Sequence, residues 1–180
     1  MGVKRPEEYS LRISVIMPIY NAGEYLLQSL NSLQNQTLKE FELICVDDAS
    51  TDVRTKQILK EYEKTFDSIC VIYLKRNVGA GEARNIGFSK AKGECVIFLD
   101  ADDIFDKQML EAMYIRLQQE KSEVCICGYE KFFCENRSKK TNIVNARAYD
   151  KDNLNEDWLC YNSPNPWTKL CRRDFIIKNN

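Results

Sequence analysis

A short apolar run that ends in clustered acids constrains this chain more than any other stretch. The run extends from Cys95 to Leu99, and Asp100-Ala101-Asp102-Asp103 follows it directly. An uninterrupted apolar run of this length is typical of a strand buried on both faces, as in parallel sheets. Carboxylates this close together repel one another unless a cation lies between them. Two interpretations follow: a divalent metal site, or a solvated acidic turn that begins the next helix.

Strand-like and helix-like segments alternate along the rest of the chain. Further strands are expected at Arg12–Met17, Phe41–Val46, Ile69–Leu74 and Val124–Phe133. Parallel strands need long crossover connections, which are usually helices. Four consecutive strand-helix units therefore predict an α/β fold, with a mostly parallel, Rossmann-like sheet and helices on both of its faces.

Small residues and polar caps predict how these helices begin and pack. Ser50 or Thr51 is expected to cap the second helix, and Asp106 the fourth. The third helix follows a glycine-containing turn that permits a tight backbone. A face of small residues should let this helix approach the sheet closely; it consists of Ala80, Ala83, Gly87 and Ala91.

Composition bounds the class of protein. The 180 residues suit one domain, and 26 basic against 27 acidic residues give a net charge of −1. That balance argues against a broad nucleic-acid-binding surface. No apolar stretch approaches the roughly 18 residues of a membrane span, and no secretory signal is visible at the N-terminus. We therefore expect a cytoplasmic protein with reduced cysteines, with peripheral attachment to the inner face of the membrane left open.

The chain has no histidine. This excludes catalysis by serine–histidine or cysteine–histidine pairs, and it excludes most catalytic zinc sites. Acid–base chemistry must therefore fall to carboxylates, and any metal ion must be held by oxygen ligands.

Polar residues follow several of the predicted strands where those strands end. In open α/β sheets these ends meet at the crevice that binds ligands. There, the carboxylate of Asp48 could accept a hydrogen bond from the imide N–H of a pyrimidine base, which the ring of Tyr20 could flank. Arg84 and Asn85 offer donors to ribose or phosphate oxygens. Together with the acidic cluster after the fourth strand, these residues predict a site for a nucleoside diphosphate that carries a transferable group.

Four motifs in chain order resemble those of family 2 glycosyltransferases, which are nucleotide-diphospho-sugar transferases of the GT-A fold. The motifs are Ser14–Asn21, Val46–Asp52, Asn77–Gly79 with Ala83–Gly87, and Phe98–Asp103. The segment Pro166–Arg173 is similar to the stretch that leads into the acceptor side in bacterial members. The chain is thus identified as a member of bacterial type, truncated after the donor-binding region.

The resemblance implies roles for individual residues. The nucleotide-sugar would be bound by Pro18, Tyr20, Asn21, Asp47, Asp48, Asn77, Arg84, Asn85, Asp100 and Ala101. Asp100-Ala101-Asp102 would be the D-x-D motif, with Asp100 towards the ribose and Asp102 on an Mn²⁺ or Mg²⁺ ion. Asp100 and Asp103 complete the expected metal-binding set.

The resemblance also implies the reaction. A sugar would pass from a nucleotide-sugar, most often a UDP-sugar, to a hydroxyl of a saccharide or glycolipid acceptor, with inversion and with metal dependence. The expected base lies in a Glu-Asp pair beyond the Trp-x-Lys-Leu segment and has no counterpart before Asn180, because Glu156-Asp157 precedes that segment. A non-catalytic nucleotide-sugar-binding domain is therefore the alternative. Residues 1–135 are expected to form the donor-binding core, and residues 136–180 the start of an incomplete acceptor-side region.

Overall fold

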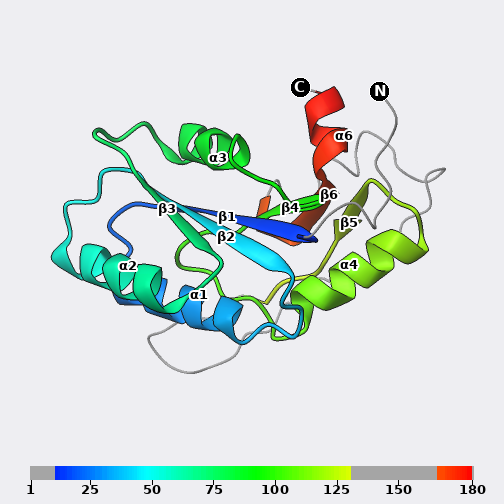
Figure 1. Cartoon of the computed structure of the whole chain (residues 1–180), viewed down its shortest axis with the longest axis horizontal. Coiled ribbons are helices and arrows are strands. Elements are labelled where there is room, and N and C mark those ends of the chain that lie inside the picture. Colours follow the sequence, from blue (N-terminus) through cyan, green and yellow to red (C-terminus); the bar gives the residue numbers. More distant parts are fainter. Residues whose placement is uncertain (1–10, 131–165, 180) are drawn as a thin grey trace.

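A twisted sheet runs through the centre of the protein. The computed structural model describes residues 11–130 and 166–179. Within them the strands are ordered β3-β2-β1-β4-β6-β5 across one sheet (Figure 1). Their bounds are β1 Ile13–Ile19, β2 Phe41–Asp47, β3 Ile69–Tyr73, β4 Cys95–Phe98, β5 Val124–Ile126 and β6 Lys169–Arg172.

The first four strands are parallel, because each is followed by a helical crossover. β1 pairs in parallel with β2 on one side and with β4 on the other, and β2 pairs in parallel with β3. β6 runs antiparallel to both of its neighbours, β4 and β5. The expected α/β class with a mostly parallel sheet is therefore confirmed.

Helices cover both faces of the sheet, as expected (Figure 1). The main apolar cluster joins the sheet to one set of helices: α1 (Glu24–Gln34), α2 (Val53–Thr65) and α4 (Met109–Gln119). A smaller cluster on the other face includes residues of α3 (Ala80–Phe88) and α6 (Arg173–Lys178). Within the described ranges, no helix has both the length and the apolar character needed to cross a bilayer.

Two of the expected helix caps were wrong. The side chain of Asp52, not that of Ser50 or Thr51, accepts the N–H groups of Thr55 and Arg54 at the start of α2. Asp106 accepts the Gln108 N–H at 2.9 Å, which stabilises a turn that comes before α4 rather than the helix itself. α2 therefore begins slightly later than expected, and α4 begins after Gln108, which provides no side-chain cap.

The segment 166–179 is part of the same sheet and is anchored by a buried acid. β6 follows the short helix η3 (Pro166–Thr168) and lies between β4 and β5. Glu94, which directly precedes β4, accepts hydrogen bonds from Tyr114 at 2.7 Å and Gln118 at 2.8 Å, and it pairs with Arg172 of β6. A buried carboxylate needs such partners, so this network fixes β6 to the core.

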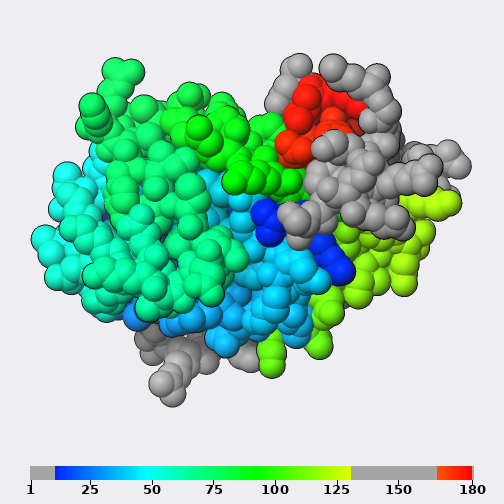
Figure 2. Space-filling view, in the orientation of Figure 1, coloured from blue at the N-terminus to red at the C-terminus, as the bar shows by residue number. Residues whose placement is uncertain are grey.

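The next helix continues this attachment. Arg173, the first residue of α6, donates a hydrogen bond to the carbonyl of Gly93 at 3.1 Å. Figure 2 shows α6, in red, against the green segment that follows α3.

β5 ends at Ile126, earlier than the sequence predicted. The part of that predicted strand beyond Glu130 and the expected division at residue 135 lie outside the described residues.

Close packing of α3 on the sheet depends on a glycine. Ala83, Gly87 and Ala91 are buried as the small-residue pattern predicted, whereas Ala80 is exposed and faces a pocket. A Cβ atom at Gly87 would lie 2.5 Å from Cγ2 of Ile16 in β1. The helix can therefore approach β1 only because no side chain is present there.

We predict that Gly87→Ala lowers the free energy of unfolding by about 1–3 kcal/mol, because the added methyl group overpacks a filled contact. The matched control is Gly81→Ala in the same helix, where an added Cβ meets no atom within 4 Å. That control should leave stability unchanged or raise it by up to about 1 kcal/mol, since alanine favours helix. Urea denaturation measures both; equal effects would contradict the close contact at Gly87.

Candidate functional site

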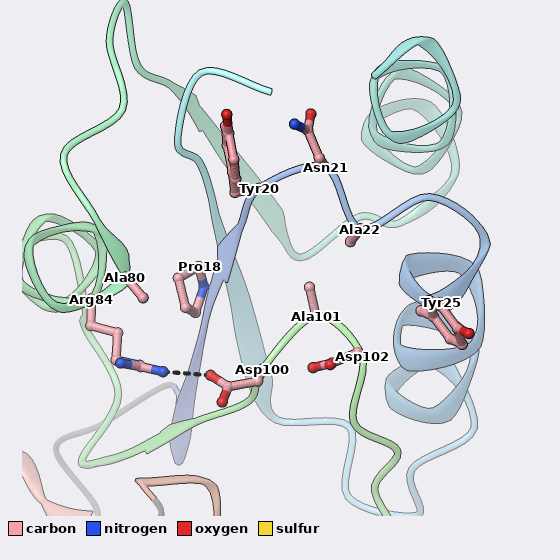
Figure 3. A pocket seen from close by; sticks show the side chains of 10 residues that line it. All are labelled: Pro18, Tyr20, Asn21, Ala22, Tyr25, Ala80, Arg84, Asp100, Ala101 and Asp102. Carbon is pink, nitrogen blue, oxygen red and sulfur yellow. Dashed lines mark hydrogen bonds and ion pairs between the residues drawn. The ribbon is translucent and has the colours of Figure 1, made fainter. Parts of the chain in front are cut away.

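A pocket opens where β1 and β4 end, between α1 and α3. Its lining comes from the end of β1 and the loop that follows it, from α1 and α3, and from the acidic segment after β4 (Figure 3). This is the edge at which open α/β sheets bind ligands. The lining residues are Pro18, Tyr20, Asn21, Ala22, Tyr25, Ala80, Arg84, Asp100, Ala101 and Asp102.

Asn21 holds the β1–α1 loop in place. Its backbone has a φ of 49°, a conformation that asparagine tolerates better than most residues. Its side-chain oxygen accepts the N–H groups of Thr51 at 2.8 Å and Asp52 at 2.9 Å. Close by, the Gly23 N–H donates to Oγ1 of Thr55 at 2.8 Å. The β1–α1 loop is thus joined to the start of α2, which fixes this side of the pocket.

Asp48 holds the loop that leads into α3. Its side chain is buried, and its two oxygens accept the N–H groups of Val78 at 2.7 Å and Gly79 at 2.8 Å. Asn77 reaches back to the Asp48 carbonyl at 3.3 Å. Gly79, with a φ of 88°, is the residue at which α3 begins and has no side-chain cap. Asp48 therefore sets the position of the helix that carries Arg84.

Two other residues expected at the site have local partners. The buried Asp47 accepts the Ser50 N–H at 3.1 Å, which closes the turn after β2. Asn85 is exposed, and its side-chain amide donates to Glu82 at 3.3 Å on the surface of α3. Neither residue, nor Asp48 or Asn77, lines the pocket.

Arg84 is the cation of the pocket lining, and one of its donors has no acceptor. Its guanidinium lies 2.6 Å from Oδ1 of Asp100, and both side chains are largely buried (Figure 3). The Nε atom of Arg84 is buried without a hydrogen-bond partner, the only such side-chain atom among the described residues. An unpaired buried donor of this kind is costly. The atom is not exposed to the pocket, so a ligand could reach it only after the side chain moves.

Negative charge exceeds positive charge at the end of β4. Asp102 is exposed in the pocket lining, and Asp103 lies next to it, half-buried. Burial, with the charges of Asp102 and Asp100 adding to it, raises the pKa of Asp103 to about 6. Across residues 11–130 and 166–179, however, no three acidic or cysteine side chains converge closely enough to hold a metal ion. Asp100 instead pairs with Arg84.

Tyr25, Ala22 and Ala80 line the pocket although the sequence did not predict this. Tyr25 lies in the first turn of α1, where the apolar stripe of Leu26, Leu30 and Leu33 accounts for the buried side of the helix. Tyr25 lies beside that stripe, and its ring is exposed. The sequence indicated its place in the pocket only in one way: Tyr25 is an aromatic residue that lies outside the buried stripe of its helix.

The fold and the pocket together define a class of protein. A mostly parallel sheet with a pocket at its carboxyl edge, lined by an arginine and clustered carboxylates, is the arrangement of a ligand-binding α/β protein. Residues 14–177 match the family described as Glycosyl transferase family 2, and the chain belongs to that family.

Bacterial glycosyltransferases are among its relatives. The chain is 40% identical over 117 residues to the putative teichuronic acid biosynthesis glycosyltransferase TuaG of Bacillus subtilis, a match that covers 65% of this chain and 46% of TuaG. It is 30% identical over 184 residues to the cholesterol galactosyltransferase of Borreliella burgdorferi, covering 96% of this chain and 51% of the relative. The chain therefore spans about half the length of these curated relatives.

Solved structures agree with the fold. The structure of S. aureus TarS 1-349 in complex with UDP-GlcNAc is similar with a TM-score of 0.73 and 29% identity. The similarity covers 94% of this chain and 47% of that one. The expected GT-A fold is thereby confirmed.

We predict that Asp48→Ala lowers the free energy of unfolding by about 2–4 kcal/mol, because the Val78 and Gly79 N–H groups lose their buried acceptor. The control is Asp102→Ala, since within the described structure the Asp102 side chain is exposed and has no hydrogen-bond partner. That control should change stability by less than about 0.5 kcal/mol. Guanidinium denaturation distinguishes them, and a stable Asp48→Ala variant would contradict the role of Asp48 in holding the loop.

Proposed function

We propose that this chain is the donor-binding part of an enzyme that transfers a sugar from a UDP-sugar to an acceptor hydroxyl. The single observation that carries the proposal is the guanidinium of Arg84, a cation that lines a pocket at the carboxyl edge of the sheet beside clustered carboxylates. A diphosphate supplies strong acceptor oxygens and negative charge at such a position. The similar TarS structure is a complex with UDP-GlcNAc, which supports a UDP-sugar as the donor class.

The residues at the pocket fit the parts of such a donor. Tyr20, at the end of β1, offers a half-exposed ring that can flank the base. Asp48 still has acceptor capacity, because each carboxylate oxygen has a second lone pair beyond the one used for the loop. We propose that it also accepts the imide N–H of uracil while it holds α3, which requires the base to reach this buried residue outside the pocket lining.

A divalent ion, Mn²⁺ or Mg²⁺, fits the donor set after β4. Asp102 would hold it, with Asp100 and Asp103 close in sequence, and the uncompensated negative charge around Asp103 favours a cation there. Mg²⁺ is commonly held by one or two carboxylates together with substrate phosphates, so three converging side chains are not required. When bound, the ion would stabilise the charge that develops on the departing diphosphate.

The remaining parts of the proposal concern the acceptor. The reaction proceeds with inversion, in the synthesis of a cell-surface polysaccharide or glycolipid, on the cytoplasmic side of the membrane. A carboxylate must take the proton of the attacking hydroxyl. Residues 1–135 form the donor-binding core and residues 136–180 begin the acceptor side, with β6 of that second part completing the sheet of the core. The Glu156-Asp157 pair lies outside the described residues.

A non-catalytic nucleotide-sugar-binding domain is the second candidate. It is favoured by the ion pair between Asp100 and Arg84, which engages one carboxylate of the pocket lining. A pocket that only binds a nucleotide-sugar needs no carboxylate free to accept a proton.

We predict that UDP binds in the presence of Mn²⁺ and that Asp102→Ala weakens this binding by tenfold or more, because the ion loses its carboxylate ligand. Isothermal titration calorimetry measures the affinities. The matched control is Asp67→Ala, which removes an exposed aspartate between α2 and β3 and should leave the affinity within twofold of wild type.

A second control tests how the ion is held. Because no three acidic side chains converge within the described residues, Mn²⁺ without UDP should bind far more weakly than Mn²⁺ with UDP. Failure of the wild type to bind UDP with Mn²⁺ would overturn the proposed function. Unchanged affinity in Asp102→Ala would remove Asp102 from the metal site.

We also predict slow release of UDP when the chain is incubated with UDP-GlcNAc and Mn²⁺, because water can replace the acceptor hydroxyl. A coupled assay for UDP measures this release, with Asp102→Ala as the inactive comparison. Release that depends on Asp102 supports the transferase. Tight binding of UDP-GlcNAc with no release above the level of Asp102→Ala favours the non-catalytic binding domain.

A further inference from the structure

Two tyrosines in the pocket differ from tyrosines elsewhere in the fold. Tyr62, Tyr73 and Tyr114 each donate their hydroxyl to a side-chain oxygen, of Asn31, Glu63 and Glu94 respectively. Tyr20 and Tyr25, which line the pocket, are each 53% exposed. Within the described part of the chain, their hydroxyls have no hydrogen-bond partner. Among the residues that the structure describes, neither packing nor hydrogen bonding therefore accounts for these two rings.

The position of Tyr25 is fixed by its surroundings. It lies between Glu24 and the buried Leu26 in the first turn of α1. Glu24 pairs with Arg54 of α2 at 2.6 Å, and the preceding Gly23 is bonded to Thr55 of the same helix. The turn that carries Tyr25 is thus tied to α2 at two points. A ring held this way is ready to contact a ligand without ordering a mobile segment first.

The two rings lie on different sides of the acidic segment. In Figure 3, Tyr20 lies at one end of the pocket, Tyr25 lies on α1 beyond Asp102, and Arg84 lies on the opposite, α3 side. A nucleotide-sugar has its diphosphate in the middle, with the nucleoside on one side and the sugar on the other. With the diphosphate at Arg84 and Asp102, one ring is available to each end of the donor.

We infer that the ring of Tyr25 contacts the transferred sugar, as the wall of the sugar subsite, while Tyr20 serves the nucleoside. This inference rests on the proposed function. Aromatic rings carry negative charge on their faces, so they attract the weakly positive C–H groups of a sugar ring and shield it from water. Tyr25 is therefore a specificity residue: its ring favours sugars that present a C–H face towards α1.

The test compares UDP with UDP-sugars on the full chain in the presence of Mn²⁺. Calorimetry first identifies which of UDP-GlcNAc, UDP-GalNAc, UDP-glucose and UDP-galactose the wild type binds most tightly. Tyr25→Ala should then weaken binding of that UDP-sugar by about three- to tenfold, the range of one aromatic contact. Binding of UDP should stay within twofold of wild type, because UDP does not reach Tyr25.

Two variants define what the ring contributes. Tyr25→Phe keeps the ring and should bind the same UDP-sugar within twofold of wild type. Tyr73→Ala removes an exposed tyrosine of β3 that does not line the pocket, and it should leave both affinities unchanged. Thermal unfolding of each variant confirms that the fold is retained.

The outcomes separate this inference from the proposed function. A loss confined to the UDP-sugar in Tyr25→Ala, with Tyr25→Phe unaffected, supports the sugar contact. Three outcomes would overturn it: equal losses for UDP and the UDP-sugar, no loss for either, or a loss in Tyr25→Phe as large as in Tyr25→Ala. None of these outcomes would contradict the proposed function. Absence of UDP binding in the wild type would overturn the proposed function itself.

Discussion

The carboxylate of Asp48 connects parts of the chain that would otherwise be positioned independently. It lies buried after β2, and its two oxygens take the N–H groups of Val78 and Gly79 at the entrance to α3. The backbone N–H of Asp48 donates to the carbonyl of Ile19 at the end of β1. The ends of β1 and β2 and the start of α3 are thereby held together. The placement of Arg84 on α3, and with it the basic side of the pocket, depends on this arrangement.

The same edge of the sheet has an excess of negative charge that residues 11–130 and 166–179 do not neutralise. Arg84 pairs with Asp100, while Asp102 lies exposed beside a half-buried Asp103. Under the proposed function, a metal ion would arrive together with a diphosphate, because the phosphate oxygens would supply ligands that the side chains do not. Donor and metal binding would then be mutually dependent, each raising the affinity for the other by the same factor.

Much of the fold could be predicted because the central strands β1, β2 and β4 are buried on both faces. Apolar runs such as Cys95–Leu99 identify β4 directly, and the alternation with helices fixes the parallel order. Helix starts were less predictable: the cap of α2 falls at Asp52 because Ser50 is already engaged with the Asn21 N–H. That contact joins residues far apart in the chain, so no local pattern reveals it.

The site was predictable to the extent that it follows strand ends. Pro18, Tyr20, Arg84, Asp100 and Asp102 line one pocket, and their roles in binding a nucleotide-sugar stay a prediction. Asp48 and Asn21 engage backbone groups about thirty positions away in the sequence, and such partners depend on the assembled fold. Tyr25 was missed because helical periodicity predicts which residues are buried and does not distinguish a solvated aromatic from one that faces a pocket.

The place of β6 in the sheet has a consequence for how the protein is made. β4 is paired with β1 on one side, and its other side is paired with β6, which ends at Arg172. β5 is synthesised earlier than β6, yet within the described sheet it is joined to the other strands through β6. During translation this half of the sheet therefore cannot assemble until the last described strand has left the ribosome. The nascent chain meanwhile presents an open strand edge, the kind of surface that invites association between chains.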